Sequence, residues 1–330
     1  MQISNPHKMV VLSRSGQDES SHYGWAVLID SQAQIIQEWG DSNVPIFPRS
    51  ALKPLQTLAV VASGAAKQLP LTHQQLALAS ASHEGEEIHL KPVVEWLKSM
   101  HLDESALACG PEWPKRSKER SDRILSGLAS SPLLHNCSGK HCGQLSLCKH
   151  QKWPFENYNQ LNHPAQQFFL EILSEVSTHT PLAIGVDGCT LPAPQMRLKD
   201  FAYALARLSD PQQMPSTVLA EASATILEAT ISNPDLTGGT RAPNSMITKA
   251  GNGDFFAKNG AEGVYGVISR KHKKALALKI ADGADRAAIC AISGLIKKIG
   301  WSDDPIIQNF SYQALLNSAK QPIGLMSCVI

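Results

Sequence analysis

The chain has 330 residues, enough for one large domain or two ordinary ones, and 43% of them are hydrophobic. Charged residues make up 18% and the formal net charge is +1, so the composition excludes a chain kept unfolded by its own charge and argues against electrostatic binding to nucleic acid or anionic lipid. The first residues lack the pattern of a secretory signal, and apolar stretches such as 55–65 are too short to span a membrane, so we expect a cytoplasmic protein.

The first part of the chain predicts a β-hairpin, a loop and then a helix. Residues 8–14 and 22–38 are rich in β-branched and apolar residues and flank a polar turn, 15–21, as in an opening hairpin. A loop rich in proline and polar residues follows. From Ser50 apolar side chains recur with helical spacing as far as Gly64, so Ser50 is expected at the start of a helix.

The middle of the chain is predicted to be mostly helical. Thr72 has the character of an N-cap for a helix over 73–80. Helical periodicity recurs over four further segments, 86–100, 164–177, 195–208 and 216–231. The loops expected between the helices hold most of the reactive side chains, at 80–87, 135–143 and 185–192.

Strand patterns return near the end of the chain. They are expected at Phe255-Phe256, 263–268 and 275–280, and a long helix is expected over 282–299. Strands at both ends with helices between them predict an α/β (α+β) fold in one domain, 1–330. One mixed or antiparallel sheet would come from about 8–49 and 240–330, with the helical part, about 50–239, inserted.

The motif R-S-A-L-K-P at 49–54 is the strongest local signal for catalysis. Serine and lysine three residues apart at a helix start share a face, with about 5–6 Å between their Cβ atoms. A neutral lysine could then take the proton of the Ser50 hydroxyl, provided that burial or a second cation lowers the pKa of Lys53. The alternative is an N-capping serine beside a solvated lysine. Much later, Lys258-Asn259-Gly260 is expected at the start of an edge strand.

Two further clusters suggest parts of an active site. The run S-A-S-H-E-G-E at 80–86 holds Ser80, Ser82 and His83 around a glycine, and is either an active-site loop or a capped junction between helices. Arg241, in G-G-T-R-A-P-N-S at 238–245, could pair with a substrate carboxylate or lie in a surface turn.

The third cluster combines thiols, imidazoles and an amine. H-N-C-S-G-K-H-C-G at 135–143 and G-V-D-G-C-T-L-P at 185–192 fit no standard zinc spacing. Cys137 and Cys189 with one or two ligands from 140–142 could form an unusual tetrahedral site, or Cys137 could be a catalytic thiol beside His141. The chain has seven cysteines, and an odd number argues against a disulfide framework. Four of them are interpreted as small buried hydrophobic residues: Cys109, Cys148, Cys290 and Cys328.

Taken in order, five motifs resemble the asparaginase II family of the rhizobial inducible type, from about Ser13 to Ile299. They are R-S-A-L-K-P-L-Q, S-H-E-G-E, C-S-G-K-H, G-V-D-G-C-T-L-P and K-N-G-A-E-G-V-Y. The resemblance implies a serine β-lactamase-like fold and hydrolysis of L-asparagine to L-aspartate and ammonia. It implies two Ser–Lys pairs, Ser50 with Lys53 and Ser82 with Lys258, where Ser82 is preferred to Ser80 because it directly precedes His83.

The resemblance also implies a zinc ion held by Cys137, Lys140 and Cys189, a substrate pocket lined by Asp187 and Arg49, and a homodimer. We add His83 and Arg241 as candidates for substrate binding. Three other functions fit the motifs less closely: a zinc-assisted amidohydrolase or glutaminase, a non-catalytic amino-acid-binding protein on the same scaffold, and a penicillin-interacting acyl hydrolase. Which serine is acylated stays open.

Overall fold

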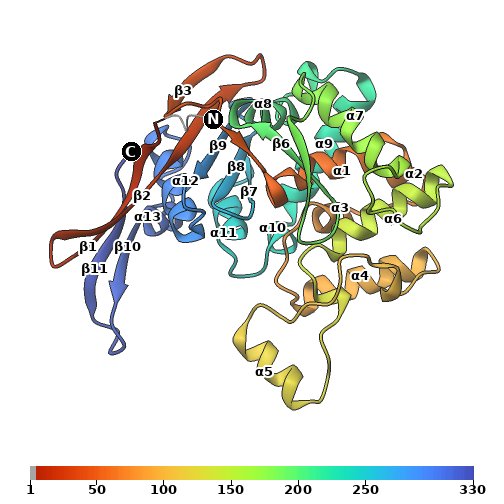
Figure 1. Cartoon of the computed structure of the whole chain (residues 1–330), viewed down its shortest axis with the longest axis horizontal. Helices are drawn as coiled ribbons and strands as arrows, with labels where there is room; N and C mark the ends of the chain where they lie inside the picture. Colours follow the sequence, from red (N-terminus) through yellow and green to blue (C-terminus); the bar gives the residue numbers. More distant parts are fainter. Residues whose placement is uncertain (1–4) are drawn as a thin grey trace.

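The computed structural model describes residues 5–330, and its central feature is an antiparallel sheet built from both ends of the chain (Figure 1). Its main path runs in the order β10-β11-β1-β2-β9-β8-β7, with β3 paired to β2. The first strand pairs with the last, with Val10 opposite Cys328. The strands are β1 His7–Arg14, β2 Gln17–Asp30, β3 Ile35–Trp39, β7 Phe255–Asn259, β8 Val264–Ser269, β9 Lys274–Ile280, β10 Tyr312–Leu316 and β11 Pro322–Cys328. This sheet confirms the predicted architecture.

The inserted segment forms the helical part of the molecule. Its helices are α1 Lys53–Ala62, α2 Ala65–Gln68, α3 His73–Ala79, α4 Glu87–Ser99, α5 Ser117–Leu125, α6 Ser138–Gln151, α7 Pro164–Ser177, α8 Leu198–Leu208, α9 Thr217–Ser232 and α10 Pro234–Thr237. A small second sheet has the order β4-β6-β5, from β4 Pro45–Ile46, β6 Pro192–Arg197 and β5 Ala183–Val186. Three helices belong to the C-terminal part: α11 Pro243–Ala250, α12 Asp285–Lys298 and α13 Pro305–Ser311.

The strict alternation of strand side chains explains why helices cover both faces of the main sheet. In β2, Trp25, Val27 and Ile29 belong to the core formed with α1, α7, α8 and α9. Ala26 and Leu28 point the other way, into the core formed with α11, α12 and α13. A third core holds the helical part together around Trp96.

Several predicted boundaries were wrong. The hairpin turn is two residues, Ser15 and Gly16, both with positive φ, because such a turn matches the strand twist. The segment 22–38 is not one strand, since β2 ends at Asp30 and β3 starts at Ile35. Residues 195–197 belong to β6, so helix α8 begins at Leu198.

Two further differences from the predicted elements affect the candidate site. Residues 138–143, expected in a loop, form the first turns of α6. Lys258 was expected at the start of its strand and lies near the end of β7 instead. The prediction that β7 is an edge strand is confirmed.

Candidate active site

The loop that carries Ser82 is fixed at both ends by backbone hydrogen bonds. It follows α3, whose start is capped by Thr72 as predicted. The Ser82 N–H donates to Thr237 O at 3.0 Å, and the Glu84 N–H donates to Gly238 O at 2.8 Å. Ser82 is therefore held against the turn after α10, and its side chain is half-buried rather than enclosed.

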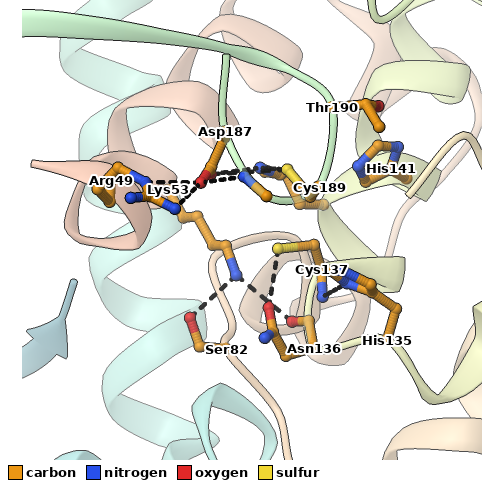
Figure 2. Close-up of polar contacts among 12 residues, drawn as sticks. Arg49, Lys53, Ser82, His135, Asn136, Cys137, His141, Asp187, Cys189 and Thr190 are labelled. Carbon is orange, nitrogen blue, oxygen red and sulfur yellow. Dashed lines mark hydrogen bonds and ion pairs between the residues drawn. The ribbon is translucent and has the colours of Figure 1, made fainter. Parts of the chain in front are cut away.

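Two buried lysines meet at the Ser82 hydroxyl. Ser82 Oγ lies 2.9 Å from Lys53 Nζ and 2.8 Å from Lys258 Nζ. Figure 2 shows Lys53 extending from α1 down to Ser82 and to the backbone of Asn136. Lys53 is 0% and Lys258 is 2% exposed, so neither amine is freely hydrated. The structure thus brings together three residues from three distant motifs.

Each amine has further oxygen partners. Lys53 Nζ donates to Ala81 O and lies 3.4 Å from Asn136 O. Lys258 Nζ donates to Asn259 O at 2.7 Å and to the Asn259 side-chain oxygen at 3.0 Å. Including Ser82 Oγ, each amine nitrogen has three oxygen partners among residues 5–330.

Burial disfavours the charged form of both lysines. It lowers the pKa of Lys53, and it lowers the pKa of Lys258 well below the ordinary lysine value, where the neighbouring Lys53 cation adds to the effect. Two ammonium groups on one hydroxyl would also repel each other, which favours the loss of a proton from one of them.

The other two candidate serines are placed differently. The Ser80 hydroxyl is buried and donates to the Thr57 hydroxyl at 2.9 Å, so it faces the core. Ser50 is half-buried in a short 3₁₀ turn, Arg49–Leu52, ahead of α1. Among residues 5–330 no hydrogen bond joins its hydroxyl to Lys53, whose amine points to Ser82 instead. The predicted Ser50–Lys53 pair is therefore not formed as a hydrogen bond, and a catalytic role for Ser50 stays a prediction.

Arg49 and Asp187 form an ion pair beside this turn. Arg49 Nε donates to Asp187 Oδ1 at 2.7 Å. Arg49 has φ +52° and Thr190, three residues after Asp187, has φ +77°, conformations that are strained for residues other than glycine. The ion pair between Arg49 and Asp187 therefore joins two turns that each contain a residue with strained backbone.

The predicted metal ligands also converge. Lys140 Nζ lies 2.9 Å from Cys189 Sγ and 3.9 Å from Asp187 Oδ2, and it is buried. Figure 2 shows the Cys137 sulfur directed toward this group, 2.9 Å from the side chain of Asn136. The set is two sulfurs and one amine nitrogen, a donor type that zinc accepts. Within the described part of the chain, no three His, Cys, Asp or Glu side chains converge as a metal site, so this one depends on Lys140.

Charges in this cluster balance one another. A hydrogen bond from the Cys189 thiol, with the cations Lys140 and Lys53, holds the pKa of Cys137 well below its usual value, while the same bond raises the pKa of Cys189. Burial lowers the pKa of Lys140, but the two sulfurs and Asp187 outweigh it and raise that pKa. These shifts favour a negative charge on Cys137 beside a positive charge on Lys140. A metal cation would displace protons from the thiol and the amine.

Three further residues singled out in the sequence, His83, His141 and Arg241, have the following surroundings. His83 is 0% exposed, and its Nε2 lies 2.8 Å from the Ser138 hydroxyl, so its ring is turned away from solvent. His141 Nδ1 lies 2.5 Å from the Tyr158 hydroxyl and does not pair with Cys137, which removes the Cys137–His141 dyad as an alternative. Arg241 is exposed and has no hydrogen bond or ion pair within residues 5–330. Substrate binding by His83 and Arg241 stays a prediction.

The comparisons with known proteins now bear on this geometry. The model of the family described as L-asparaginase II matches residues 10–328. The chain belongs to that family. No curated protein matches.

Solved structures with a likeness to this L-asparaginase II chain have β-lactamase titles. One from Mycobacterium bovis is 12% identical, with a TM-score of 0.43, covering 84% of this chain and 95% of that one. A putative β-lactamase from Bacteroides dorei is 13% identical, with a TM-score of 0.43, covering 78% and 84%. A third, from Desulfarculus baarsii, is 12% identical, with a TM-score of 0.40, covering 84% and 91%. At these scores the likeness gives no information on substrate or mechanism.

No helix among the described residues of this family member has the length and hydropathy that crossing a bilayer requires.

Three residues of the site were missed in the sequence. Asn136 and Asn259 supply oxygens to Lys53 and Lys258, and each lies directly beside a residue already singled out, which was the available signal. Arg116 had none. It forms ion pairs with Glu84 and Glu86 of the Ser82 loop, both at 3.0 Å, from a segment outside all of the motifs singled out in the sequence.

Proposed function

We propose that this protein hydrolyses L-asparagine to L-aspartate and ammonia, with Ser82 as the nucleophile. Membership of the L-asparaginase II family supports the reaction. The observation that carries the mechanism is the Ser82 hydroxyl between the amines of Lys53 and Lys258. The hydroxyl of a free serine is too weak a nucleophile, and an adjacent base is the usual way to activate it.

The contacts of the two lysines support one assignment of protons. A neutral amine has two N–H donors and one lone pair. Lys258 would donate both to the oxygens of Asn259 and accept the Ser82 proton with the lone pair. An ammonium has three donors, and Lys53 would use them on Ala81 O, Asn136 O and Ser82 Oγ. This accounts for every polar hydrogen of both amines.

The reaction then follows from those positions. Ser82 Oγ attacks the carbon of the side-chain amide as Lys258 takes the hydroxyl proton. The carbon–nitrogen bond breaks, Lys258 returns the proton to the leaving nitrogen, and ammonia departs from an ester on Ser82. Water attacks the ester carbon as Lys258 accepts a proton from it, the bond from that carbon to Ser82 Oγ breaks, and Lys258 returns the proton to Ser82 Oγ, which releases aspartate and restores the hydroxyl. Lys53, as a fixed cation, stabilises negative charge on Ser82 Oγ.

Arg49 and Asp187 suit the two charged groups of the substrate. We assign Arg49 to the α-carboxylate, which a guanidinium can bind through two parallel hydrogen bonds, and Asp187 to the α-ammonium. Their mutual ion pair at 2.7 Å would open to admit an amino acid. Glutamine differs by one methylene, which is worth about 1–3 kcal/mol of discrimination in a pocket.

We also propose zinc at Cys137, Lys140 and Cys189. The donor set fits, because two thiols and an amine already lie together around one positive charge. When bound, zinc would supply a Lewis acid that can polarise an oxygen ligand. We propose from the resemblance that the protein works as a homodimer, and from the residue pattern that it is cytoplasmic.

The deciding experiment is ammonia release from L-asparagine by the purified protein and by Ser82→Ala, Ser50→Ala and Ser80→Ala. Activity that is lost in Ser82→Ala and kept in Ser80→Ala would support the proposal. Loss in Ser50→Ala with activity in Ser82→Ala would instead make Ser50 the acylated serine. No activity of the parent on asparagine or glutamine, with zinc supplied, would refute the asparaginase and leave an amino-acid-binding protein.

Removing zinc with a chelator distinguishes Ser–Lys catalysis from the second candidate function, zinc-assisted hydrolysis. A Ser–Lys enzyme keeps its acylation step after zinc is removed, whereas a zinc-activated water does not. A burst of ammonia from the chelated protein, equal to the amount of enzyme, would favour Ser–Lys chemistry.

A further inference from the structure

A small cavity lies behind the strand that carries Lys258. It has a volume of about 160 Å³, is partly open to solvent beside the exposed Asp285, and is lined by α11, the end of β7, β8 and the start of α12, elements at the centre of Figure 1. Its lining is Pro243, Asn244, Asn259, Gly260, Val264, Tyr265, Asp285, Ala288 and Ile289. Ser82 and Lys53 do not line it, and it adjoins the candidate active site only through Asn259, whose oxygens accept from Lys258 on the other side.

Tyr265 provides the first sign of a missing ligand. It is 1% exposed, and its hydroxyl has no hydrogen-bond partner. Burial, with the nearby Asp285 carboxylate, raises the pKa of the phenol, so it stays a protonated hydroxyl. A buried hydroxyl that has lost water and gained no partner is unfavourable, and an occupant of the cavity with a matching polar group would satisfy it.

The charge of the lining favours a cation. Among the residues around this cavity Asp285 is the acidic one, and none is Lys, Arg or His. Asn244 uses its side-chain N–H on Thr237 O at 3.3 Å, so its oxygen is the part left for a ligand. The start of α12 would favour an anion, but Asp285 in its first turn already supplies that negative charge. The acceptors offered to a cation are therefore the Asp285 carboxylate, the Tyr265 hydroxyl and the Asn244 oxygen, whereas Asn259, whose oxygen accepts from Lys258, can offer only N–H donors.

The apolar part of the lining sets the size and kind of cation. Pro243, Val264, Ala288 and Ile289 cannot ligate a metal ion, but they can contact methylene groups. At about 30 Å³ for each water-sized group, the cavity holds about five heavy atoms. We propose that this cavity is a binding site for a small primary alkylammonium compound, with the ammonium on Asp285 and Tyr265 and the chain among the apolar residues.

The test is thermal unfolding of the full chain with n-butylammonium, and with 1-butanol and butyrate at matched ionic strength. These probes share size and differ in charge. The melting temperature is expected to rise saturably with butylammonium alone, since a ligand of the native state stabilises it by mass action. An equal rise with butanol would show a purely apolar cavity, a rise with butyrate alone would show an anion site, and no rise would show no site; each overturns the proposal.

Substitutions in the lining test whether butylammonium binds in this cavity. Tyr265→Phe removes the hydroxyl and Asp285→Asn the charge, and each is expected to weaken butylammonium binding about tenfold, as for a lost hydrogen bond to a charged group. Asp303→Asn removes the same charge from an exposed position outside the cavity and is the matched control. A shift that is unchanged in Tyr265→Phe and Asp285→Asn would place the ligand elsewhere and refute the assignment.

Discussion

Replacing Lys258 by methionine is expected to change activity and stability in opposite directions. The side chain is 2% exposed and its amine is the proposed proton acceptor for Ser82. A general base in this position contributes about 100- to 10,000-fold to the rate, so Lys258→Met should lower kcat by that factor. Methionine has a similar length and no charge, and it removes a group that burial disfavours.

The effect on stability has a definite pH dependence. The pKa of Lys258 is lowered in the folded chain from 10.5, so between the folded and unfolded pKa values the unfolded chain binds more protons. Each unit of lowering costs about 1.4 kcal/mol of folding free energy, in full below the folded pKa, decreasing as pH rises and vanishing above 10.5. Against this, Asn259 loses two donors, at about 1 kcal/mol each, but it is half-buried and water can replace them.

Denaturant unfolding between about pH 6 and pH 10 would measure the difference between Lys258→Met and the parent. We expect the variant to be more stable near neutral pH and the difference to shrink as pH rises. Lys67→Met, at an exposed lysine of α2, is the control and should show no such trend. A constant difference, or a variant that keeps kcat within about tenfold of the parent, would refute the reasoning.

Three further predictions follow from particular contacts. In Gly260→Ala the new Cβ would lie 2.3 Å from Pro48 O, so the free energy of unfolding, measured by chemical denaturation, should fall by about 1–3 kcal/mol. Gly143→Ala, whose Cβ would lie 3.4 Å from its nearest neighbour, should lose less, and equal losses would contradict the packing argument. Arg116→Gln removes the ion pairs to Glu84 and Glu86 and should lower kcat/KM severalfold, because the Ser82 loop becomes less firmly held. The free energy of unfolding should change by no more than about 1 kcal/mol, and unchanged kinetics would show that the ion pairs have no role in activity. Cys189→Ser should abolish zinc retained through gel filtration, as measured by elemental analysis, while Cys148→Ser, which changes a buried thiol of α6 outside the cluster, should retain it; zinc kept by Cys189→Ser would exclude the proposed ligand set.

Sequence pattern predicted elements whose apolar residues follow a regular arrangement. Helical stripes, which report burial on one face, located α7, α9 and α12, and short apolar runs located β7 to β9, whose side chains are almost all buried. It failed at α6, because Ser138 to Cys148 are all buried and leave no polar face to define a stripe. It failed at α5 for the opposite reason, since that helix has no buried residue.

The candidate site was accessible from the sequence only through the resemblance. Ser82 and Lys258 are 176 positions apart, and no rule of spacing connects them. The spacing of Ser50 and Lys53 did suggest a pair, but it could not say where a buried amine finds acceptors. That depends on Ala81 O and Asn136 O, which the fold brings beside α1 from other parts of the chain.

The surroundings of Lys53 indicate which group each motif contributes to the proposed reaction. Lys53 lies at the first residue of α1, after a turn that leads Ser50 away from its amine, so the helix extends the lysine into the interior. There its charge requires acceptors, because a buried ammonium without them is strongly disfavoured. Ser82 contacts both amines, and a hydroxyl that accepts from one can donate only to the other. In the mechanism that we propose, the first motif therefore contributes a cation, the second the hydroxyl and the last the base, whereas local spacing alone would have made Ser50 the nucleophile.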